Sequence, residues 1–190
     1  MKVVIFGDSI TNGYGIDGNL QTPILKDKLA QLTDAEISLY GHNGEDTFDA
    51  LRWRPYIKEE APDKVFIFFG ANDAARNHAI TPEDFAENLT HFIRAFGPEK
   101  TVLLTPPYHN DSVDAIFRNN QEIARYRLMT LQVARTFEPD GCQLIDITQR
   151  MQNAINPDTL LQADGLHFSE AGYDLLSAAI AEKCNPLTPV

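Results

Sequence analysis

The sequence predicts an α/β fold in which helices cover both faces of a parallel, five-stranded sheet. Short apolar runs rich in β-branched and aromatic residues alternate with longer amphipathic stretches, which is the pattern of strands joined by crossover helices. A chain of 190 residues, 43% of them hydrophobic, is long enough for one well-buried core and short for two domains. We therefore expect a single domain over residues 1–190, a three-layer α/β/α sandwich of flavodoxin-like type.

The apolar runs give the strands, and the amphipathic stretches between them give the helices. The predicted strands are Lys2–Phe6, Glu36–Tyr40, Lys64–Phe69, Thr101–Thr105 and Gln143–Ile147. The predicted helices are Leu20–Leu32, Thr47–Glu60, Thr81–Phe96, Ser112–Phe137 and Ser169–Lys183. Thr81 followed by Pro82 is a typical helix start, and Gly97-Pro98 is a typical stop. The last residues, Asn185–Val190, are expected to form a frayed tail.

The charge balance excludes several classes of partner. The formal net charge of −11 creates a field that repels phosphate backbones and anionic lipid headgroups, so we expect neither nucleic acid nor a membrane surface as a partner. Neutral or cationic small substrates fit this charge better. The two cysteines, Cys142 and Cys184, lack the spacing of a metal site, and we expect them to be reduced thiols.

The chain shows no sign of export or membrane insertion. The apolar run at Met1–Phe6 is shorter than the ~7–15 apolar residues in the centre of a signal peptide. No stretch of the sequence approaches the ~20 apolar residues that span a bilayer. These observations predict a cytoplasmic protein without membrane insertion.

Polar loops with glycine follow three of the predicted strands, and a similar segment precedes the last helix. Ligands of such sheets bind outside the carboxyl ends of the strands, so functional residues are expected in these loops. If the sheet is wound as predicted, the four segments converge in space. They are Gly7–Gly13 (GDSITNG), Gly41–Thr47 (GHNGEDT), Gly70–Asp73 (GAND) and Ala163–Ser169 (ADGLHFS).

These four segments, in this order, resemble the sequence blocks of the SGNH hydrolases, also called the GDSL lipase/esterase family. Gly7-Asp8-Ser9 stands where the family has its nucleophile, and Gly44 matches the glycine of the second block. Gly70-Ala71-Asn72-Asp73 matches the GxND of the third block, and Asp164-Gly165-Leu166-His167 matches the DxxH of the last. The resemblance covers residues 7 to 167 and implies the SGNH hydrolase fold with ester hydrolase activity.

Within the family, the sequence is most similar to the isoamyl-acetate-hydrolysing esterase branch. Ala74, the Pro106-Pro107 pair and the segment Asp164–Ser169 carry this similarity. There is one departure from the family pattern. Glu45 stands between Gly44 and Asp46, whereas the family often has Asp-Thr soon after the second-block glycine.

The chemistry of the residues supports the same interpretation. A serine hydroxyl is a poor nucleophile at neutral pH and needs a base within about 3 Å to take its proton. A histidine with its ordinary pKa near ~6.5 can serve as that base, and a carboxylate fixes its tautomer. Asp164 lies three residues before His167, so a single tight turn at Gly165 can bring the two together. We predict Ser9 as nucleophile, His167 as base and Asp164 as the residue that orients the base.

Three donors are predicted for the oxyanion hole. The tetrahedral intermediate carries a negative oxygen, and each preplaced donor is worth roughly 10²–10³ in rate. The backbone N–H of Ser9 lies beside the nucleophile. The backbone N–H of Gly44 is accessible because no side chain covers it, and Asn72 supplies a side-chain amide. The resemblance implies the same three roles.

The predicted activity is hydrolysis of a carboxylic ester through an acyl-enzyme, on a small, neutral, short-acyl substrate. No metal or organic cofactor is required. A sugar deacetylase, a thioesterase and a lysophospholipase share this machinery and remain open, because variable loops select the substrate. A second class also remains open, in which the same loops form a flavodoxin-like module that binds a small ligand without chemistry.

Other residues are candidates for the substrate pocket or for a different site. Tyr14, Phe48 and Tyr108 are aromatic residues near the loops and could line the pocket. The segment Gly13–Gly18 fits the glycine pattern of a dinucleotide site. It begins several residues after the first strand, however, and no acidic residue ends the second strand at Tyr40, so a dinucleotide is not expected.

Overall fold

A computed structural model describes residues 1–113 and 116–184 of the chain. Within these residues the five strands form a parallel sheet, as the sequence predicts, and their order is β2-β1-β3-β4-β5. Each strand ends within two residues of its predicted limit, and the tail predicted at Asn185–Val190 lies outside the described residues. The strands are β1 (Lys2–Gly7), β2 (Glu36–Gly41), β3 (Lys64–Phe68), β4 (Thr101–Leu104) and β5 (Gln143–Ile145).

The strand order reverses beside β1. The chain passes from β1 outward to β2 and then returns to place β3 on the other side of β1. In the register of the sheet, Gly7 at the end of β1 pairs with Gly41 of β2 and with Phe68 of β3. The loops that follow these three strands therefore start at one level, at the point where ligands bind in folds of this type.

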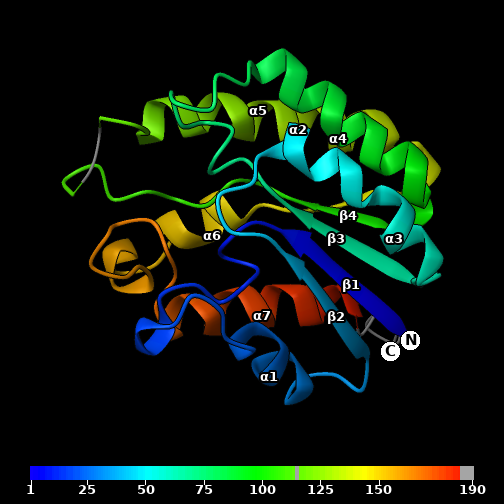
Figure 1. The fold of residues 1–190 in the computed structure, drawn as a ribbon, viewed down its shortest axis with the longest axis horizontal. Helices are drawn as coiled ribbons and strands as arrows, with labels where there is room; N and C mark the ends of the chain where they lie inside the picture. Colours follow the sequence, from blue (N-terminus) through cyan, green and yellow to red (C-terminus); the bar gives the residue numbers. More distant parts are fainter. Residues whose placement is uncertain (114–115, 185–190) are drawn as a thin grey trace.

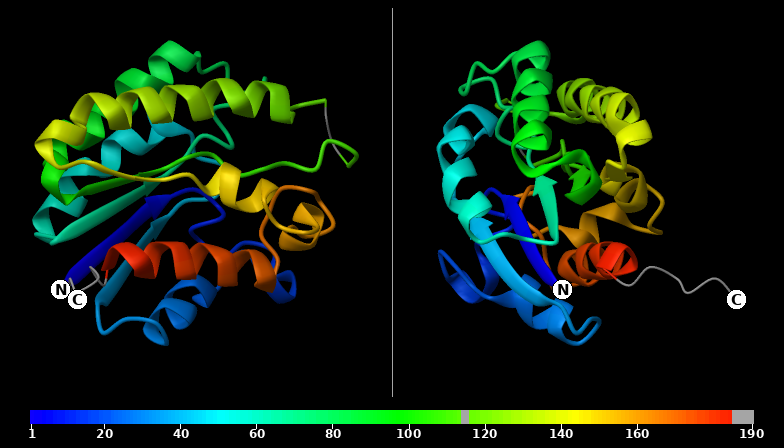
Figure 2. Two further views of the ribbon diagram at one scale, coloured as in Figure 1. Left: turned by 180° about the vertical axis from the view of Figure 1, so that it is seen from behind. Right: turned by 90° about the vertical axis from the view of Figure 1, so that its right-hand side faces the viewer.

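Helices cover both faces of the sheet (Figure 1). One face carries α1 (Ile24–Ala30), α6 (Ile147–Gln152) and α7 (Glu170–Cys184). The other face carries the remaining helices, and the two further views show the same three layers (Figure 2). These helices are α2 (Thr47–Ala50), α3 (Arg54–Glu59), α4 (Pro82–Phe96) and α5 (Asn120–Phe137).

Strand β1 shows why both faces must be covered. Val3 and Ile5 belong to the core on the α1 and α7 side, whereas Val4 and Phe6 belong to the core on the α4 and α5 side. All four side chains are fully buried. Since successive side chains of a strand point to opposite faces, a continuous apolar run is stable only between two layers.

The helix predicted at Thr47–Glu60 is broken in the structure. It consists of α2, a 3₁₀ turn at Leu51–Trp53 and α3. Pro55 lies in the first turn of α3, where its missing N–H does no harm, and it cannot continue an α-helix from the residues before it. The helix predicted at Leu20–Leu32 is also shorter, because α1 begins only after Pro23.

Two further differences follow from capping residues. The helix predicted from Ser112 begins at Asn120, because the side chain of Asn119 accepts from the N–H of Glu122 at 3.0 Å and caps α5. Residues 114–115 of that prediction lie outside the described residues. The last strand ends at Ile145, and Asp146 caps α6, a helix that the sequence analysis missed. The short 3₁₀ helices elsewhere are Ile16–Gly18, Pro98–Lys100, Glu138–Asp140 and Pro157–Leu160.

The helix limits that rest on clear sequence signals are confirmed. The hydroxyl of Thr81 accepts from the N–H of Asp84 at 3.1 Å and caps α4. The helix ends at Gly97, which has a φ of 97°. Both cysteines are free and buried. Among the helices of the described ranges, none is long and apolar enough to cross a bilayer.

Candidate active site

Ser9, His167 and Asp164 form a continuous chain of hydrogen bonds. The Oγ atom of Ser9 lies 2.9 Å from Nε2 of His167. On the other side of the ring, Nδ1 of His167 lies 2.6 Å from Oδ2 of Asp164. Ser9 sits in the turn directly after β1, and the other two lie in the loop before α7. The fold thus brings together three side chains that the sequence analysis predicted as a unit.

A tight turn holds the aspartate against the histidine. The Oδ1 atom of Asp164 accepts from the backbone N–H groups of Leu166 and His167, each at 3.0 Å. Gly165 has a φ of 72°, which L side chains rarely adopt. Partial burial opposes ionisation of Asp164, but the hydrogen bonds from His167 and from the two backbone groups outweigh it and lower its pKa to about 2. The carboxylate is therefore charged and fixed in place at neutral pH.

The ring of His167 also contacts an aromatic side chain. The ring centroid of Tyr14 lies 4.5 Å from that of His167, with 40° between the planes. The backbone carbonyl of Tyr14 accepts from Nε2 of Gln162 at 2.9 Å. Gln162 in turn donates its backbone N–H to the carbonyl of His167 at 2.7 Å. The loop after β1 and the loop before α7 therefore hold each other, which fixes the distance between Ser9 and His167.

The nucleophile's own loop is held from within the core. Asp8 is buried, and its Oδ1 accepts from the N–H of Ile10 at 2.9 Å. The hydroxyl of Tyr173, from α7, donates to the carbonyl of Ile10 at 2.7 Å. Burial raises the pKa of Asp8 to about 6. A buried Asp8 that binds its own turn explains why an acidic residue precedes Ser9 without facing the cavity.

Gly44 and Asn72 lie on neighbouring loops beside the nucleophile. Gly44 has a φ of 77°, in the region that favours glycine. The side-chain amide of Asn72 is buried and donates one hydrogen bond to the carbonyl of Glu45 at 2.9 Å. A primary amide carries two N–H hydrogens, so a second donor is left for another acceptor. Gly44 and Asn72 thus line the same cavity as Ser9 and His167.

A cavity of about 360 Å³ opens over these groups. The predicted residues Ser9, Gly44, Asn72 and His167 line it, and Asp164 lies behind the histidine. Tyr14, Asn43, Arg118 and Leu166 complete its wall. Within the described ranges, no three acidic, histidine or cysteine side chains are grouped so that they could hold a metal ion. The arrangement suits nucleophilic attack on a small electrophile.

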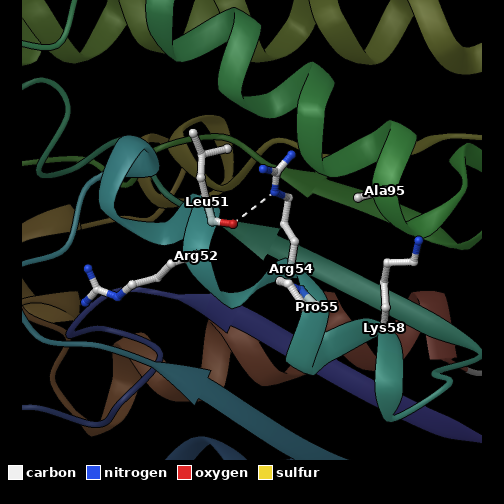
Figure 3. A pocket seen from close by; sticks show the side chains of 6 residues that line it. All are labelled: Leu51, Arg52, Arg54, Pro55, Lys58 and Ala95. Carbon is white, nitrogen blue, oxygen red and sulfur yellow. Dashed lines mark hydrogen bonds between the residues drawn. The ribbon is translucent and has the colours of Figure 1, made fainter.

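A larger cavity of about 650 Å³ shares none of its described lining residues with the first one (Figure 3). Its described lining residues include no serine and no histidine, and Arg54 donates to the carbonyl of Leu51 within the same segment. Size alone does not define a reactive site, because chemistry needs a nucleophile and a base in contact. The lining residues are Leu51, Arg52, Arg54, Pro55, Lys58 and Ala95.

Comparison with known proteins agrees with this geometry. Residues 5–175 match the GDSL-like Lipase/Acylhydrolase family. The chain belongs to this family. It is therefore a carboxylic ester hydrolase of the GDSL type.

Relatives and solved structures support the assignment. The chain is 28% identical to a GDSL esterase/lipase of Arabidopsis thaliana over 96% of its length and 85% of the relative's. It is 26% identical to the isoamyl acetate-hydrolyzing esterase of Schizosaccharomyces pombe, over 92% of its length and 71% of that protein. The structure of a lipase/acylhydrolase from Enterococcus faecalis superposes with a TM-score of 0.89 at 36% identity, covering 96% of this chain and 94% of that one. The parallel sheet is thus the GDSL hydrolase fold.

The structure accounts for the departure from the GDSL pattern at Glu45. The carboxylate of Glu45 is bound by the guanidinium of Arg52 and by Nε1 of Trp53, the latter at 2.9 Å. The backbone carbonyl of Glu45 accepts from Asn72. The additional residue is therefore tied to its surroundings at both its side chain and its backbone, and the loop that carries Gly44 stays in place.

Sequence reasoning missed part of the cavity wall. Arg118 lies in a segment predicted to be helical, and its Nε donates to the carbonyl of Ala71 at 3.2 Å. No local motif marks Arg118, because its position depends on where α5 begins. Of the aromatic candidates, Tyr14 lines the cavity. Phe48 and Tyr108 are not among its lining residues, and the hydroxyl of Tyr108 instead donates to Asp158 at 2.9 Å.

Proposed function

We propose that this GDSL hydrolase cleaves small, neutral esters with a short acyl group, with Ser9 as nucleophile, His167 as general base and Asp164 as the orienting carboxylate. The observation that carries the proposal is the pair of hydrogen bonds on the two sides of one imidazole. These are 2.9 Å to Ser9 Oγ and 2.6 Å to Asp164 Oδ2. Both lie within the range that proton transfer requires.

Acylation begins with attack of Ser9 Oγ on the ester carbonyl carbon. The hydroxyl proton passes to Nε2 of His167, and the charged Asp164 stabilises the imidazolium through Nδ1–H. The carbonyl electron pair moves onto oxygen, which gives a tetrahedral oxyanion. When the oxyanion collapses, the bond to the alcohol breaks, and the leaving alkoxide takes the proton from His167.

The oxyanion is stabilised by groups on three loops. The backbone N–H groups of Ser9 and Gly44 and the second amide hydrogen of Asn72 are the donors. The first amide hydrogen of Asn72 is engaged by Glu45 at 2.9 Å, so the side chain is oriented before the substrate arrives. Preorganised donors need no rearrangement during the reaction, and this is the main source of their effect on rate.

Deacylation repeats the same proton transfers with water. His167 takes a proton from a water molecule as its oxygen attacks the acyl carbon, and the second oxyanion forms in the same place. Its collapse releases the carboxylic acid, and the proton returns to Ser9 Oγ.

The cavity and one set of relatives support a short acyl group. A volume of about 360 Å³ lies at the lower end of the range for small-molecule sites. Tyr14 and Leu166 give its wall an apolar part beside the reacting groups. A relative from Schizosaccharomyces pombe is an isoamyl acetate-hydrolyzing esterase. In isoamyl acetate, a two-carbon acyl group is joined to a small alkyl alcohol.

The nucleophile is tested by labelling and turnover. Wild-type protein is expected to react with a fluorophosphonate and to hydrolyse p-nitrophenyl acetate, and Ser9→Ala should do neither. Ser38→Ala, in β2, is the matched control and should behave as the wild type does. Full labelling of Ser9→Ala would contradict the assignment.

The substrate class is tested with a panel of esters. We expect kcat/KM to be highest for acetyl and butyryl p-nitrophenyl esters and for isoamyl acetate, and to fall for decanoyl esters. Acetylated xylose, acetyl-coenzyme A and lysophosphatidylcholine test the deacetylase, thioesterase and lysophospholipase alternatives. A value for any of these three that exceeds the value for isoamyl acetate would replace the proposed substrate class. A wild type inert toward every ester and toward the phosphonate would favour a binding module.

A further inference from the structure

A buried aspartate lies next to Asn72 and takes no part in the mechanism described above. Asp73 is only 1% exposed. Its Oδ1 atom accepts from the backbone N–H of Thr47 at 3.0 Å and from the hydroxyl of Thr47 at 2.5 Å. Its Oδ2 atom has no hydrogen-bond partner among the described residues. Burial raises the pKa of this carboxyl to about 7.

Such a carboxyl is costly for a folded protein. Burying a polar atom without a hydrogen bond costs free energy, and a carboxylate without a cation costs more. Groups that break this rule are concentrated where function requires them. Asp73 is therefore expected to have a function for the loops that it joins.

Three consecutive residues of the Gly44 loop are bound to the loop after β3. The carbonyl of Glu45 accepts from Asn72, and Thr47 donates twice to Asp73. Between them, Oδ2 of Asp46 lies 2.9 Å from Nδ1 of His78. Gly44 directly precedes this triplet, so the position of its N–H depends on these contacts.

The hydroxyl of Thr47 connects the contact to the core. It accepts from Nδ2 of Asn88 at 3.0 Å, and Asn88 lies on the buried side of α4. Because the hydroxyl accepts from Asn88, its single proton is directed to Asp73. Asn88, Thr47 and Asp73 thus form a buried chain of hydrogen bonds that runs from a rigid helix to the residue beside Asn72.

From this arrangement we infer that Asp73 is a positioning residue for ester hydrolysis, which acts through Thr47 to hold Gly44 and Asn72 in register as oxyanion donors. The inference rests on the proposed function. Asp73 holds the Gly44 loop, and the neighbouring Asn72 holds the same loop through Glu45, so the two donors are linked at two points. A displacement of about 1 Å in such a site can lower the rate by roughly 10²-fold.

The experiment compares two threonine-to-valine substitutions. Thr47 and Thr148 are both buried, both lie in the first turn of a short helix, and both donate through their hydroxyls. We expect Thr47→Val to lower kcat on p-nitrophenyl acetate by about 10- to 100-fold, with KM changed by less than about threefold. Thr148→Val should leave kcat and KM unchanged, although it loses comparable hydrogen bonds. Circular dichroism and thermal unfolding verify that both variants are folded.

Three further variants keep the test decisive if Thr47→Val does not fold. Thr47→Ser keeps the hydroxyl and should retain a kcat near the wild-type value. Asp73→Asn keeps an acceptor for Thr47 and should lose about threefold or less, whereas Asp73→Ala should lose as much as Thr47→Val. Affinity for a boronic acid, which forms a tetrahedral anion on serine, should fall in parallel with kcat.

Specific outcomes would overturn the inference. Equal losses of kcat in Thr47→Val and Thr148→Val would mean that Thr47 only supports the fold. A rise in KM with unchanged kcat would place its effect on substrate binding. Failure of the proposed function is distinguishable, because in that case the wild type itself would neither turn over an ester nor react with the phosphonate.

Discussion

Two buried threonine hydroxyls donate to aspartates at the carboxyl edge of the sheet, and the two aspartates ionise in opposite ways. Thr47 donates to Asp73, and Thr105 donates to Asp146 at 3.0 Å. Asp146 also receives hydrogen bonds from Arg127 and from the backbone of α6. Burial opposes its ionisation, but these bonds lower its pKa. The Asp73 carboxyl has no such cation in the described residues, and its pKa is raised to about 7.

The difference separates two tasks of buried polar groups. Asp146 joins β5, α5 and α6 in a network in which its charge is compensated, so its contribution is to stability. Asp73 joins two loops that carry proposed catalytic donors, and its charge is uncompensated. The comparison predicts that changes around Asp146 alter the free energy of unfolding, whereas changes around Asp73 alter the rate.

Among the variants that test this comparison, Asn72→Ala is expected to have the largest effect on the rate. Loss of one oxyanion donor should lower kcat by about 10²–10³-fold and leave KM nearly unchanged. The variant should remain measurably active, because Ser9 and Gly44 still donate. Steady-state kinetics on p-nitrophenyl acetate measures this effect. A loss of less than about threefold would remove Asn72 from the proposed oxyanion hole.

The corresponding test of the aspartate that contributes to stability is Asp146→Ala. It removes the cap of α6 and leaves the guanidinium of Arg127 without its carboxylate. We expect the free energy of unfolding to fall by about 2–3 kcal/mol, since the pair is partly exposed. Denaturant unfolding measures this loss, and kcat at low temperature should not change. A large loss of kcat in the folded variant would show that this network also positions the site.

The strands and the hydrogen-bonded residues of the site were predictable from the sequence, whereas some residues around the cavity were not. Strand positions were predictable within two residues because a run such as Val3–Phe6, apolar at every position, is stable only between two layers. The grouping of Ser9, His167 and Asp164 was predictable because these residues stand in sequence blocks that, in this order, resemble those of the SGNH hydrolases. Ser9 and His167 are 158 residues apart in the sequence, and they come into contact only because of the order of the strands in the sheet.

Other features were not predictable from local pattern. Arg118 was predicted to be helical because the segment has a helical composition, but α5 begins only at Asn120, after Asn119 accepts a capping hydrogen bond from the N–H of Glu122. The role of Asp73 was also missed. Its burial and its contact with Thr47 depend on how β3 and α2 pack, and a sequence does not show which oxygen of a carboxyl is left without a partner.

The dependence of stability on pH provides a sharper test of the comparison. Asp73 has a raised pKa, so its contribution to stability is present at low pH and is lost as the pH rises from about 4 to about 7. Asp146 has a lowered pKa, so its contribution is present at neutral pH and is lost as the pH falls below about 4.

Asparagine variants isolate these two contributions. Relative to the wild type, Asp73→Asn should become more stable as the pH rises from 4 to about 8. Asp146→Asn should become less stable relative to the wild type as the pH rises toward about 4 from more acidic values. Denaturant unfolding at several pH values gives both differences. Slopes of the same sign for the two variants would contradict the opposite pKa shifts.

The smallest effect is expected from two helix caps, and it tests whether residues 45–47 are coupled to the site. Asp46 caps α2 by accepting from the N–H of Asp49 at 3.0 Å, and Thr81 caps α4 by accepting from Asp84 at 3.1 Å. Each alanine substitution should cost about 1 kcal/mol of stability, because each leaves one N–H of a first turn without its acceptor.

The kinetic consequences of the two caps should nevertheless differ. Asp46 also contacts His78 and lies two residues from Gly44, so Asp46→Ala should lower kcat. Thr81→Ala removes only a cap and should leave kcat as it is in the wild type. Equal kcat values for the two variants would mean that the loop carrying Gly44 is held without Asp46, and that Asn72 and Asp73 alone fix its position.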